Sequence, residues 1–326
     1  MTKQTDPVLS VVVPIYNEGA SLKLFHTSLV RVLSDCAKDD YEIIYCDDGS
    51  NDGCSELITD WATHNPSVKL VQFSRNFGKE NALSAGIAHA SGKAIIMLDG
   101  DNQHPVQLIP RFLDTWKSGA EVVVGIRESN TDEGWVKKLG SKFFYKLFNK
   151  LTDQKLLPGS TDFRLIDRSV QQAFLELNET NRITRGLIDW LGFRRDYVHF
   201  DAVARQAGNA GYSPRKLVQL ATNSFVSLTL KPLYLFGYLG VFITIAAFLL
   251  GSAVLVEQLL LNDPWHWLFT GTSMLGILVL FLVGILLMAQ GIVSLYISDL
   301  HSQSRQRPLY VISYKRSVGI AKKRND

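Results

Sequence analysis

The chain contains few cysteines and little net charge, and each shortage excludes a class of protein. Three cysteines in 326 residues cannot build a disulfide framework, and Cys36, Cys46 and Cys54 show no CxxC spacing that would favour a thiol-bound metal. A net charge of +3 is too weak to indicate a nucleic-acid binder. Residues 1–7 are polar and lack an apolar core, so we expect no secretory signal. A composition that is 46% hydrophobic, without a repeat or low-complexity tract, also excludes disorder and collagen-like structure.

Formal charge is missing from two long stretches near the C-terminus. Residues 232–256 and residues 264–298 contain no Lys, Arg, Asp or Glu. Each stretch exceeds the roughly 20 apolar residues that are needed to cross a bilayer core. The sequence therefore predicts a hairpin of two transmembrane helices within residues 232–298, at about 232–256 and 267–297, and excludes a purely soluble protein.

The distribution of basic residues predicts how this hairpin is oriented. The connection, residues 257–263, has no Lys or Arg, whereas residues 300–326 hold seven against one acidic residue. By the positive-inside rule, both termini and the N-terminal domain lie in the cytosol, which places the protein in the inner (cytoplasmic) membrane with a basic cytosolic tail at 299–326. Gly and Ser residues between 271 and 291 allow close helix contact, so we expect a homo-oligomer; lipid exposure of that helix face is the alternative.

Two further basic segments are expected to meet the membrane surface. Residues 135–151 combine an apolar stripe that includes Phe143, Phe144 and Leu147 with five lysines, which predicts an amphipathic interface helix. A helix packed on the sheet with solvated lysines is the alternative. Residues 213–231 lead directly into the first charge-free stretch and are predicted to be a juxtamembrane segment.

Residues 1–212 are predicted to form an α/β domain, because short apolar runs alternate with helix-length segments. The predicted strands are residues 8–13, 41–46, 68–73, 93–98 and 121–124, and the predicted helices are residues 20–33, 54–63, 79–90 and 105–116. Strictly alternating strands and helices favour a mostly parallel sheet that is covered on both faces.

Polar clusters follow four consecutive strands of this sheet. They are Tyr16-Asn17-Glu18, Asp47-Asp48-Gly49-Ser50, Ser74-Arg75-Asn76 and Asp99-Gly100-Asp101. Ligands of open α/β sheets bind beyond the carboxyl ends of the strands, so these clusters are expected to converge on one active-site crevice.

The fourth cluster has the composition of a metal site. Asp99 and Asp101 are two carboxylates one residue apart, which suits a hard cation such as Mg²⁺ or Mn²⁺ that also binds phosphate oxygens. A nucleotide diphosphate would need further cations, since arginine matches phosphate oxygens bidentately. The candidates are Arg75, Lys79, Arg127, Arg164, Arg182, Arg185 and Arg205.

Six segments in order carry a resemblance to a known family. They read VVVPIYNEG, EIIYCDDGSNDG, FSRNFGKENAL, MLDGDNQHP, TDFRLIDR and NRITRGLIDWLGF. Between about residues 9 and 233 the chain resembles glycosyltransferase family 2, and within it the branch that acts on polyprenyl phosphates. The resemblance implies a GT-A type nucleotide-sugar domain, followed by amphipathic interface helices and the two-helix hairpin. It also implies inverting transfer of one sugar from a nucleotide-sugar to a membrane-bound polyprenyl (undecaprenyl) phosphate, and the bacterial branch favours a UDP-sugar over a GDP-sugar.

The resemblance also implies roles for individual residues. Asp99, Asp101 and Gln103 match the family's metal-binding DxDxQ, and Arg127 and Arg205 match arginines that hold phosphates. Asp162 lies in the DFR motif near the reacting centre, where it either orients the acceptor or acts as a base, and Arg164 lies beside it. With Asp101 and Arg127, Asp162 makes up the predicted catalytic set, and Arg164, Arg182 and Arg185 join the arginines predicted to bind phosphate. The predicted nucleotide contacts are Pro14, Tyr16, Asn17, Glu18, Asp47, Asp48, Lys79, Asp99 and Gly100.

One position departs from the family pattern, and two other functions remain open. Gly211 stands where many relatives carry a basic residue, so that either another cation serves the phosphate or the donor sugar differs. A processive polysaccharide synthase shares the same crevice, but the chain has no QxxRW motif and too few predicted membrane helices for a polymer channel. A non-catalytic membrane scaffold would have no need to keep Asp99, Asp101 and the arginines together.

Overall fold

The computed structural model describes most of the N-terminal two-thirds of the chain and part of the remainder. The described residues are 7–38, 40–101, 103–128, 159–179, 182–201, 271–304 and 307–320, with isolated positions at 238, 242, 243, 245 and 249. The chain divides into two compact units, and each is treated by itself. The first contains Met1–Lys146, Gln154–Gly211 and Arg307–Asp326, and the second contains Leu147–Asp153 and Tyr212–Gln306.

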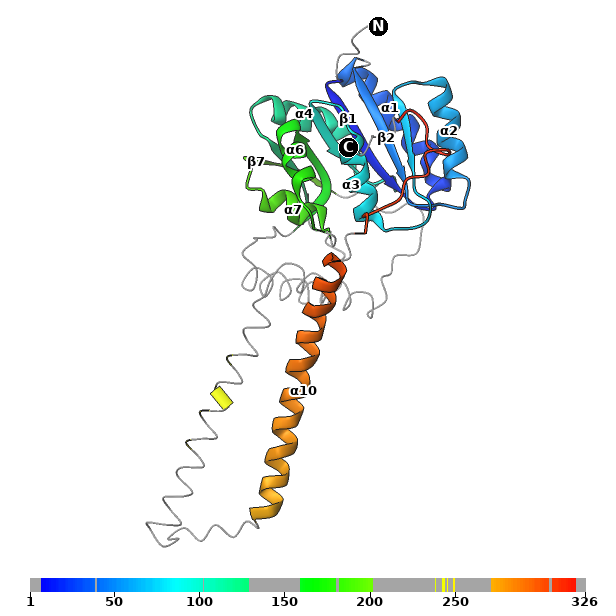
Figure 1. Cartoon of the computed structure of the whole chain (residues 1–326). Coiled ribbons are helices and arrows are strands. Elements are labelled where there is room, and N and C mark those ends of the chain that lie inside the picture. Colours follow the sequence, from blue (N-terminus) through cyan, green and yellow to red (C-terminus); the bar gives the residue numbers. More distant parts are fainter. Residues whose placement is uncertain are drawn as a thin grey trace. The chain divides into compact units, whose positions relative to one another are not determined.

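The first unit is built on a seven-stranded sheet with the strand order β3-β2-β1-β4-β6-β5-β7 (Figure 1). Only β6 runs antiparallel to its neighbours, β4 and β5. The mostly parallel sheet predicted from the sequence is therefore confirmed, whereas β6 and β7 were not predicted. The strands are β1 (Leu9–Ile15), β2 (Tyr41–Asp47), β3 (Val68–Gln72), β4 (Ala94–Met97), β5 (Val122–Glu128), β6 (Ser160–Asp167) and β7 (Arg195–Asp201).

Helices cover both faces of this sheet, because side chains of alternate strand residues point to opposite sides. In β1, Val11 and Val13 pack in one apolar core with Phe25 of α1 and Phe112 of α4, whereas Val12 packs in the other with Ile87 of α3. The helices are α1 (Gly19–Ala37), α2 (Cys54–His64), α3 (Lys79–His89), the 3₁₀ turn η1 (Val106–Leu108), α4 (Ile109–Lys117), α6 (Arg168–Glu176), α7 (Thr184–Trp190) and α10 (Gly271–Ser304).

Helix α3 approaches the sheet closely at Gly86. A Cβ atom built there would lie 2.2 Å from Val12 Cγ1 and 2.9 Å from Cys46 Sγ. The two side chains belong to the buried centres of β1 and β2, so they have little room to move away. The absence of a side chain at Gly86 therefore sets the distance between α3 and the sheet, and α3 carries Lys79 at its first position.

We expect Gly86→Ala to lower the free energy of unfolding by about 1–3 kcal/mol, because it overpacks this contact. Thermal unfolding of the purified full-length chain would measure the loss as a lower melting temperature. Gly284→Ala in α10 is the matched control, since a Cβ atom there meets no atom of the described residues within 4 Å. Equal melting temperatures for the two variants would show that α3 can shift on the sheet without cost.

The C-terminal segment pairs with the edge of the sheet. Leu70 and Val318 exchange two backbone hydrogen bonds, and Ser74 N–H donates to the carbonyl of Val311 at 2.9 Å. Tyr310 stacks on Phe73 with ring centroids 4.9 Å apart. The sequence predicted a basic cytosolic tail at 299–326. Its first residues belong to α10, which ends at Ser304, and its residues 307–320 cover the outer strand β3, where unpaired N–H and C=O groups would otherwise be exposed.

Several predicted membrane features lie outside the described residues. These are the interface helix at 135–151, the juxtamembrane segment at 213–231 and, apart from five isolated positions, the first helix at 232–256. In the part of the chain that is described, no helix combines the length and the apolarity that crossing a membrane requires. The predicted two-helix hairpin stays a prediction.

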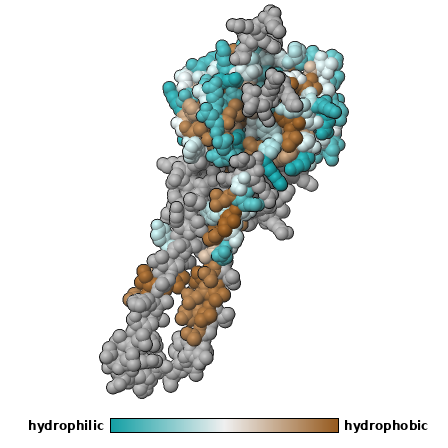
Figure 2. Space-filling model, viewed as in Figure 1, coloured by the Kyte–Doolittle hydropathy of each residue, from teal (hydrophilic) through white to brown (hydrophobic). Residues whose placement is uncertain are grey.

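Helix α10 makes up most of the described part of the second unit. It is 34 residues long, and apolar side chains along it are exposed. Figure 2 shows hydrophobic side chains gathered on this helix. They include Leu275, Val279, Leu282, Leu286, Leu295 and Ile297.

Candidate active site

The loops that follow β1, β2 and β3 are tied to one another. Ser50 Oγ accepts a hydrogen bond from Asn17 N–H at 3.0 Å, and Asn17 Oδ1 accepts one from Asn51 N–H at 3.0 Å. The carboxylate of Asp48 accepts hydrogen bonds from the N–H groups of Phe77, at 2.6 Å, and Gly78, at 2.9 Å. Three of the four polar clusters are thus held together at the carboxyl ends of their strands.

The fourth loop, after β4, meets the first one at Gly100. A Cβ atom on Gly100 would lie 2.6 Å from Oε2 of Glu18, so a side chain at this position would require the Glu18 carboxylate to move. Asp99 and Asp101 stand on either side of this contact. The predicted convergence of the four strand ends therefore exists in the structure.

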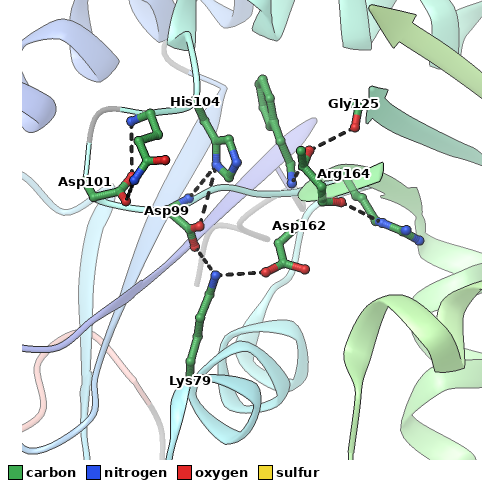
Figure 3. Close-up of polar contacts among 10 residues, drawn as sticks. Lys79, Asp99, Asp101, His104, Gly125, Asp162 and Arg164 are labelled. Atoms are coloured by element: carbon green, nitrogen blue, oxygen red, sulfur yellow. Dashed lines mark hydrogen bonds and ion pairs between the residues drawn. The ribbon is translucent and has the colours of Figure 1, made fainter. Parts of the chain in front are cut away.

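Lys79 lies between two carboxylates, one that follows β4 and one in β6. Its Nζ atom is 2.6 Å from Asp99 Oδ1, after β4, and 2.8 Å from Asp162 Oδ2, in β6 (Figure 3). Burial by itself lowers the pKa of Lys79, but the two carboxylates outweigh it and raise the pKa above its usual range. Lys79 therefore carries its positive charge at any physiological pH.

Asp162 is held in its ionised form by the same cluster. Burial raises the pKa of Asp162, but Lys79 first and Arg185 second outweigh this effect and hold the pKa below its usual range. A carboxylate with a lowered pKa is a weak base, so the arrangement favours an orienting role for Asp162 over proton abstraction.

A second carboxyl group, that of Glu80, lies next to this cluster and was not predicted from the sequence. Its Oε2 accepts a hydrogen bond from the N–H of Thr184, the first residue of α7, at 2.8 Å. Burial raises the pKa of Glu80, and the charge of Asp162 adds to the shift. Glu80 therefore joins α3, which carries Lys79, to α7, which carries Arg185. The sequence signal for this role of Glu80 was weak, because acidic residues are common in the first turn of a helix.

Asp101 is oriented by its neighbours in the β4 loop. Its two oxygens accept hydrogen bonds from the backbone N–H of Gln103, at 3.1 Å, and from Gln103 Nε2, at 2.5 Å. His104 is buried against the ring of Phe163, and its Nδ1 accepts the N–H of Asp99 at 3.0 Å. Burial lowers the pKa of His104, so this side chain holds the Asp99 backbone as a neutral ring.

The structure gives Arg164 a role other than the predicted one. Its side chain is 1% exposed and forms a two-pronged ion pair with Asp189 in α7, with Nη1–Oδ1 at 2.8 Å and Nη2–Oδ2 at 3.3 Å. Further hydrogen bonds go to the carbonyls of Thr161 and Arg185 and to Ser160 Oγ. Because these acceptors occupy the guanidinium and α7 covers it, we do not retain phosphate binding as the role of Arg164.

Arg182 is likewise used inside the protein. Its guanidinium donates to the carbonyls of Leu177, at 2.5 Å, and Glu179, at 3.1 Å, and lies over the ring of Phe174. Because these contacts occupy the guanidinium, we do not retain phosphate binding as the role of Arg182. By contrast, Arg185 is half-buried and close enough to Asp162 to lower its pKa, so it stays a candidate phosphate ligand.

The remaining predicted residues fall into three groups. Asp47 is buried, and its carboxylate accepts hydrogen bonds from Ser50 N–H and Ser55 Oγ, so it shapes the loop that presents Asp48. Tyr16 is exposed directly after the end of β1, and Pro14 is a buried residue within β1. Arg127 is in β5, where its backbone N–H donates to Gly159, and Arg205 lies outside the described residues.

The carboxylates of the β4 loop fit a hard divalent cation that is shared with a ligand. Asp99 and Asp101 offer oxygen atoms, the donor type that Mg²⁺ and Mn²⁺ prefer. Among the described residues, no group of three or more His, Cys, Asp or Glu side chains is placed to hold a metal ion by itself. Mg²⁺ in phosphate-transferring sites is typically bound by one or two carboxylates together with substrate phosphates, so two carboxylates are sufficient here only when a phosphate ligand completes the coordination.

A cavity of about 530 Å³ lies on the other side of the β2 loop. It is lined by Ser50 and Ser55 near the start of α2, by Gln72 at the end of β3, and by Lys315 and Arg316 of the C-terminal segment. Neither Asp99 nor Asp162 lines it, so it is separate from the carboxylate cluster.

The chain matches a sequence family, individual proteins of similar sequence and solved structures. The sequence profile of "Glycosyl transferase family 2" matches residues 10–174. The chain is 37% identical over 305 residues to "Uncharacterized glycosyltransferase sll0501" of Synechocystis sp., which covers 94% of each chain. It is 34% identical over 304 residues to "Bactoprenol glucosyl transferase" of Shigella phage SfV, which covers 93% of this chain and 97% of that protein. Among solved structures, the mannosyltransferase PcManGT from Pyrobaculum calidifontis, in complex with GDP-Man and Mn²⁺, is 15% identical, covers 91% of this chain and 88% of its own, and has a TM-score of 0.44.

Proposed function

The chain belongs to glycosyltransferase family 2, and we propose that it transfers a single sugar from a nucleotide-sugar, preferably a UDP-sugar, to a polyprenyl phosphate with inversion at the anomeric carbon. The observation that carries the proposal is the cluster at the strand ends, where Asp99, Lys79 and Asp162 meet within hydrogen-bonding distance. The name of the relatives described as bactoprenol glucosyl transferases supports a polyprenyl phosphate as the acceptor.

Each side of the cluster suits one substrate. Asp99 and Asp101, with Gln103 orienting Asp101, would hold Mg²⁺ or Mn²⁺ against the diphosphate of the donor. A bound divalent cation there supplies Lewis-acid stabilisation of the charge that develops on the leaving nucleoside diphosphate. The loops carrying Tyr16, Asn17 and Asp48 would hold the nucleoside, and Asp162, in strand β6, would face the acceptor.

The acceptor needs little activation by a base. A phosphomonoester has a second pKa of about 6, so its oxygen is largely ionised at neutral pH. Asp162 is itself held ionised by Lys79 and Arg185, and we propose that it positions these cations for the incoming phosphate oxygen. Arg127 in β5 is the further cation that we assign to the phosphates.

We propose that the reaction takes place at the cytoplasmic face of the inner membrane. A polyprenyl tail stays in the bilayer, so the crevice has to reach a lipid headgroup. Support comes from the two charge-free stretches of the sequence and from the exposed apolar side chains of α10. Cytosolic termini, the transmembrane hairpin and self-association are part of this proposal.

The test is a screen of radiolabelled UDP- and GDP-sugars with undecaprenyl phosphate, Mg²⁺ or Mn²⁺ and the full-length chain in detergent. We expect one donor to give a product that stays lipid-linked and carries one sugar. An insoluble polymer would instead identify a processive synthase. The absence of turnover with every donor would contradict an enzymatic role and leave the scaffold as the explanation.

A further inference from the structure

Lys79 forms an ion pair with a carboxylate that the proposed divalent cation also needs as a ligand. Its Nζ lies 2.6 Å from Asp99 Oδ1, an oxygen of the carboxylate pair assigned to the divalent cation. Its second partner, Asp162 Oδ2 at 2.8 Å, belongs to the part of the site assigned to the acceptor (Figure 3). One ammonium group therefore joins the two halves of the proposed site.

The position of Lys79 is well defined by the fold. It is the first residue of α3, and the preceding N–H groups of Phe77 and Gly78 are fixed by the carboxylate of Asp48. The lysine side chain is 44% exposed, so a ligand entering the crevice can reach it. Asp99 is held from the other side, because His104 Nδ1 accepts its backbone N–H.

An ammonium group and a divalent cation at the same carboxylate repel each other. Water screens this repulsion only in part, because the side chains of Lys79 and Asp99 are both partly buried. A cation bound by Asp99 and Asp101 would therefore have to displace Lys79 from Asp99 Oδ1. A nucleotide diphosphate changes this balance, since its negative charge gives Lys79 another partner and adds oxygen ligands to the metal.

We propose that Lys79 is an internal counter-ion that competes with the divalent cation for Asp99 until a nucleotide diphosphate arrives, so that metal and nucleotide bind cooperatively. This inference rests on the proposed metal site at Asp99 and Asp101. By linkage, the factor by which the nucleotide tightens metal binding equals the factor by which the metal tightens nucleotide binding. Lys79 is thus a positioning residue. It pairs with the Asp99 carboxylate before the donor binds and with the donor diphosphate afterwards.

The experiment measures binding and does not depend on turnover. Mn²⁺ is titrated into the full-length chain in detergent, with and without UDP, and free Mn²⁺ is read from its electron paramagnetic resonance signal. We expect Lys79→Met to tighten Mn²⁺ binding without UDP by about tenfold, the size of effect that a neighbouring charge has on an ionic equilibrium. We also expect UDP to tighten Mn²⁺ binding less in this variant than in the parent, and UDP itself to bind more weakly.

Two controls separate this mechanism from a general change of charge or fold. Lys93→Met removes the same charge from the opposite end of β4 and should leave Mn²⁺ binding within about twofold of the parent, because a solvent-exposed charge this far away is screened. Lys79→Arg keeps the charge and should bind Mn²⁺ without UDP no more tightly than the parent does. If Lys79→Met fails to fold, Lys79→Gln takes its place.

The outcomes distinguish the inference from the proposed function. If Lys79→Met binds Mn²⁺ without UDP no more tightly than the parent, Lys79 is only a phosphate ligand and the inference is wrong, even where the parent transfers sugar. If neither chain binds Mn²⁺ with or without UDP, the metal assignment fails and the inference fails with it. Tighter binding in Lys79→Met upholds the inference, whichever acceptor the enzyme uses.

Discussion

Replacing Asp101 by asparagine should reduce the rate of sugar transfer by roughly 10²–10³. Asp101 is one of two carboxylates at the end of β4, and both of its oxygens are oriented by Gln103. A metal ion contributes several kcal/mol to stabilising the charge on a leaving group, and each 1.4 kcal/mol corresponds to about a factor of ten in rate. Loss of one anionic ligand weakens both the binding of the ion and its position, so kcat should fall as well as the apparent affinity for the metal.

The measurement is the initial rate of lipid-linked product formation at saturating donor, as a function of Mg²⁺ or Mn²⁺ concentration. Asp114→Asn, on the exposed face of α4, removes the same charge away from the crevice and should keep the parental rate. Asparagine preserves the shape of the Asp101 side chain, so we expect the melting temperature of Asp101→Asn to stay within about 2 °C of the parent. A variant that transfers sugar within threefold of the parental rate would show that the metal site lies elsewhere.

The sequence was sufficient to predict the first part of the sheet, because each strand there has a local signal. The strands β1 to β4 are short apolar runs that are buried on both faces, and each is followed by a helix of regular spacing. Parallel strands connected by helices leave little choice of topology. The loops at their carboxyl ends therefore had to converge, and the hydrogen bonds of Asn17 and Asp48 are the result.

The second part of the sheet could not be predicted in the same way. Strand β6 pairs antiparallel between β4 and β5, and its residues Ser160–Asp167 were recognised as a motif and not as a strand. The C-terminal segment reaches β3 from more than 230 residues away along the sequence, as in the hydrogen bond from Gln72 N–H to Ser317 Oγ. Such contacts depend on long-range packing and leave no periodic pattern in either segment.

In the site, too, the sequence predicted which residues take part, but it did not predict where each side chain points. The sequence identified Asp99, Asp101, Lys79 and Asp162 as members of one site, but it treated six arginines alike as possible phosphate ligands. Alternation along β6 places Arg164 on the same side of the sheet as Asp162, two residues further in, where α7 covers it. Whether a guanidinium meets a phosphate or an aspartate depends on which helix lies above it, and that is a property of the tertiary structure.

Removing the carboxylate of Asp189 should have the largest effect on stability, lowering the free energy of unfolding by about 3–5 kcal/mol. The Arg164 guanidinium is 1% exposed, and Asp189 is its anionic partner. Asp189 also pairs with Arg195 in β7, at 3.2 Å. In Asp189→Ala, Arg164 would keep its charge in a buried position without its carboxylate partner, and such a charge is strongly destabilising.

Arg164→Met should cost less than Asp189→Ala, because Asp189 would still be paired with Arg195 and methionine would fill most of the space. Urea unfolding of the full-length chains, followed by tryptophan fluorescence, would rank the two variants. The pair also joins β6, which carries Asp162, to α7, which carries Arg185, so both variants should reduce transfer activity even at temperatures where they are folded. If Asp189→Ala is no less stable than Arg164→Met, the ion pair with Arg164 contributes little and the backbone carbonyls around the guanidinium hold it in place.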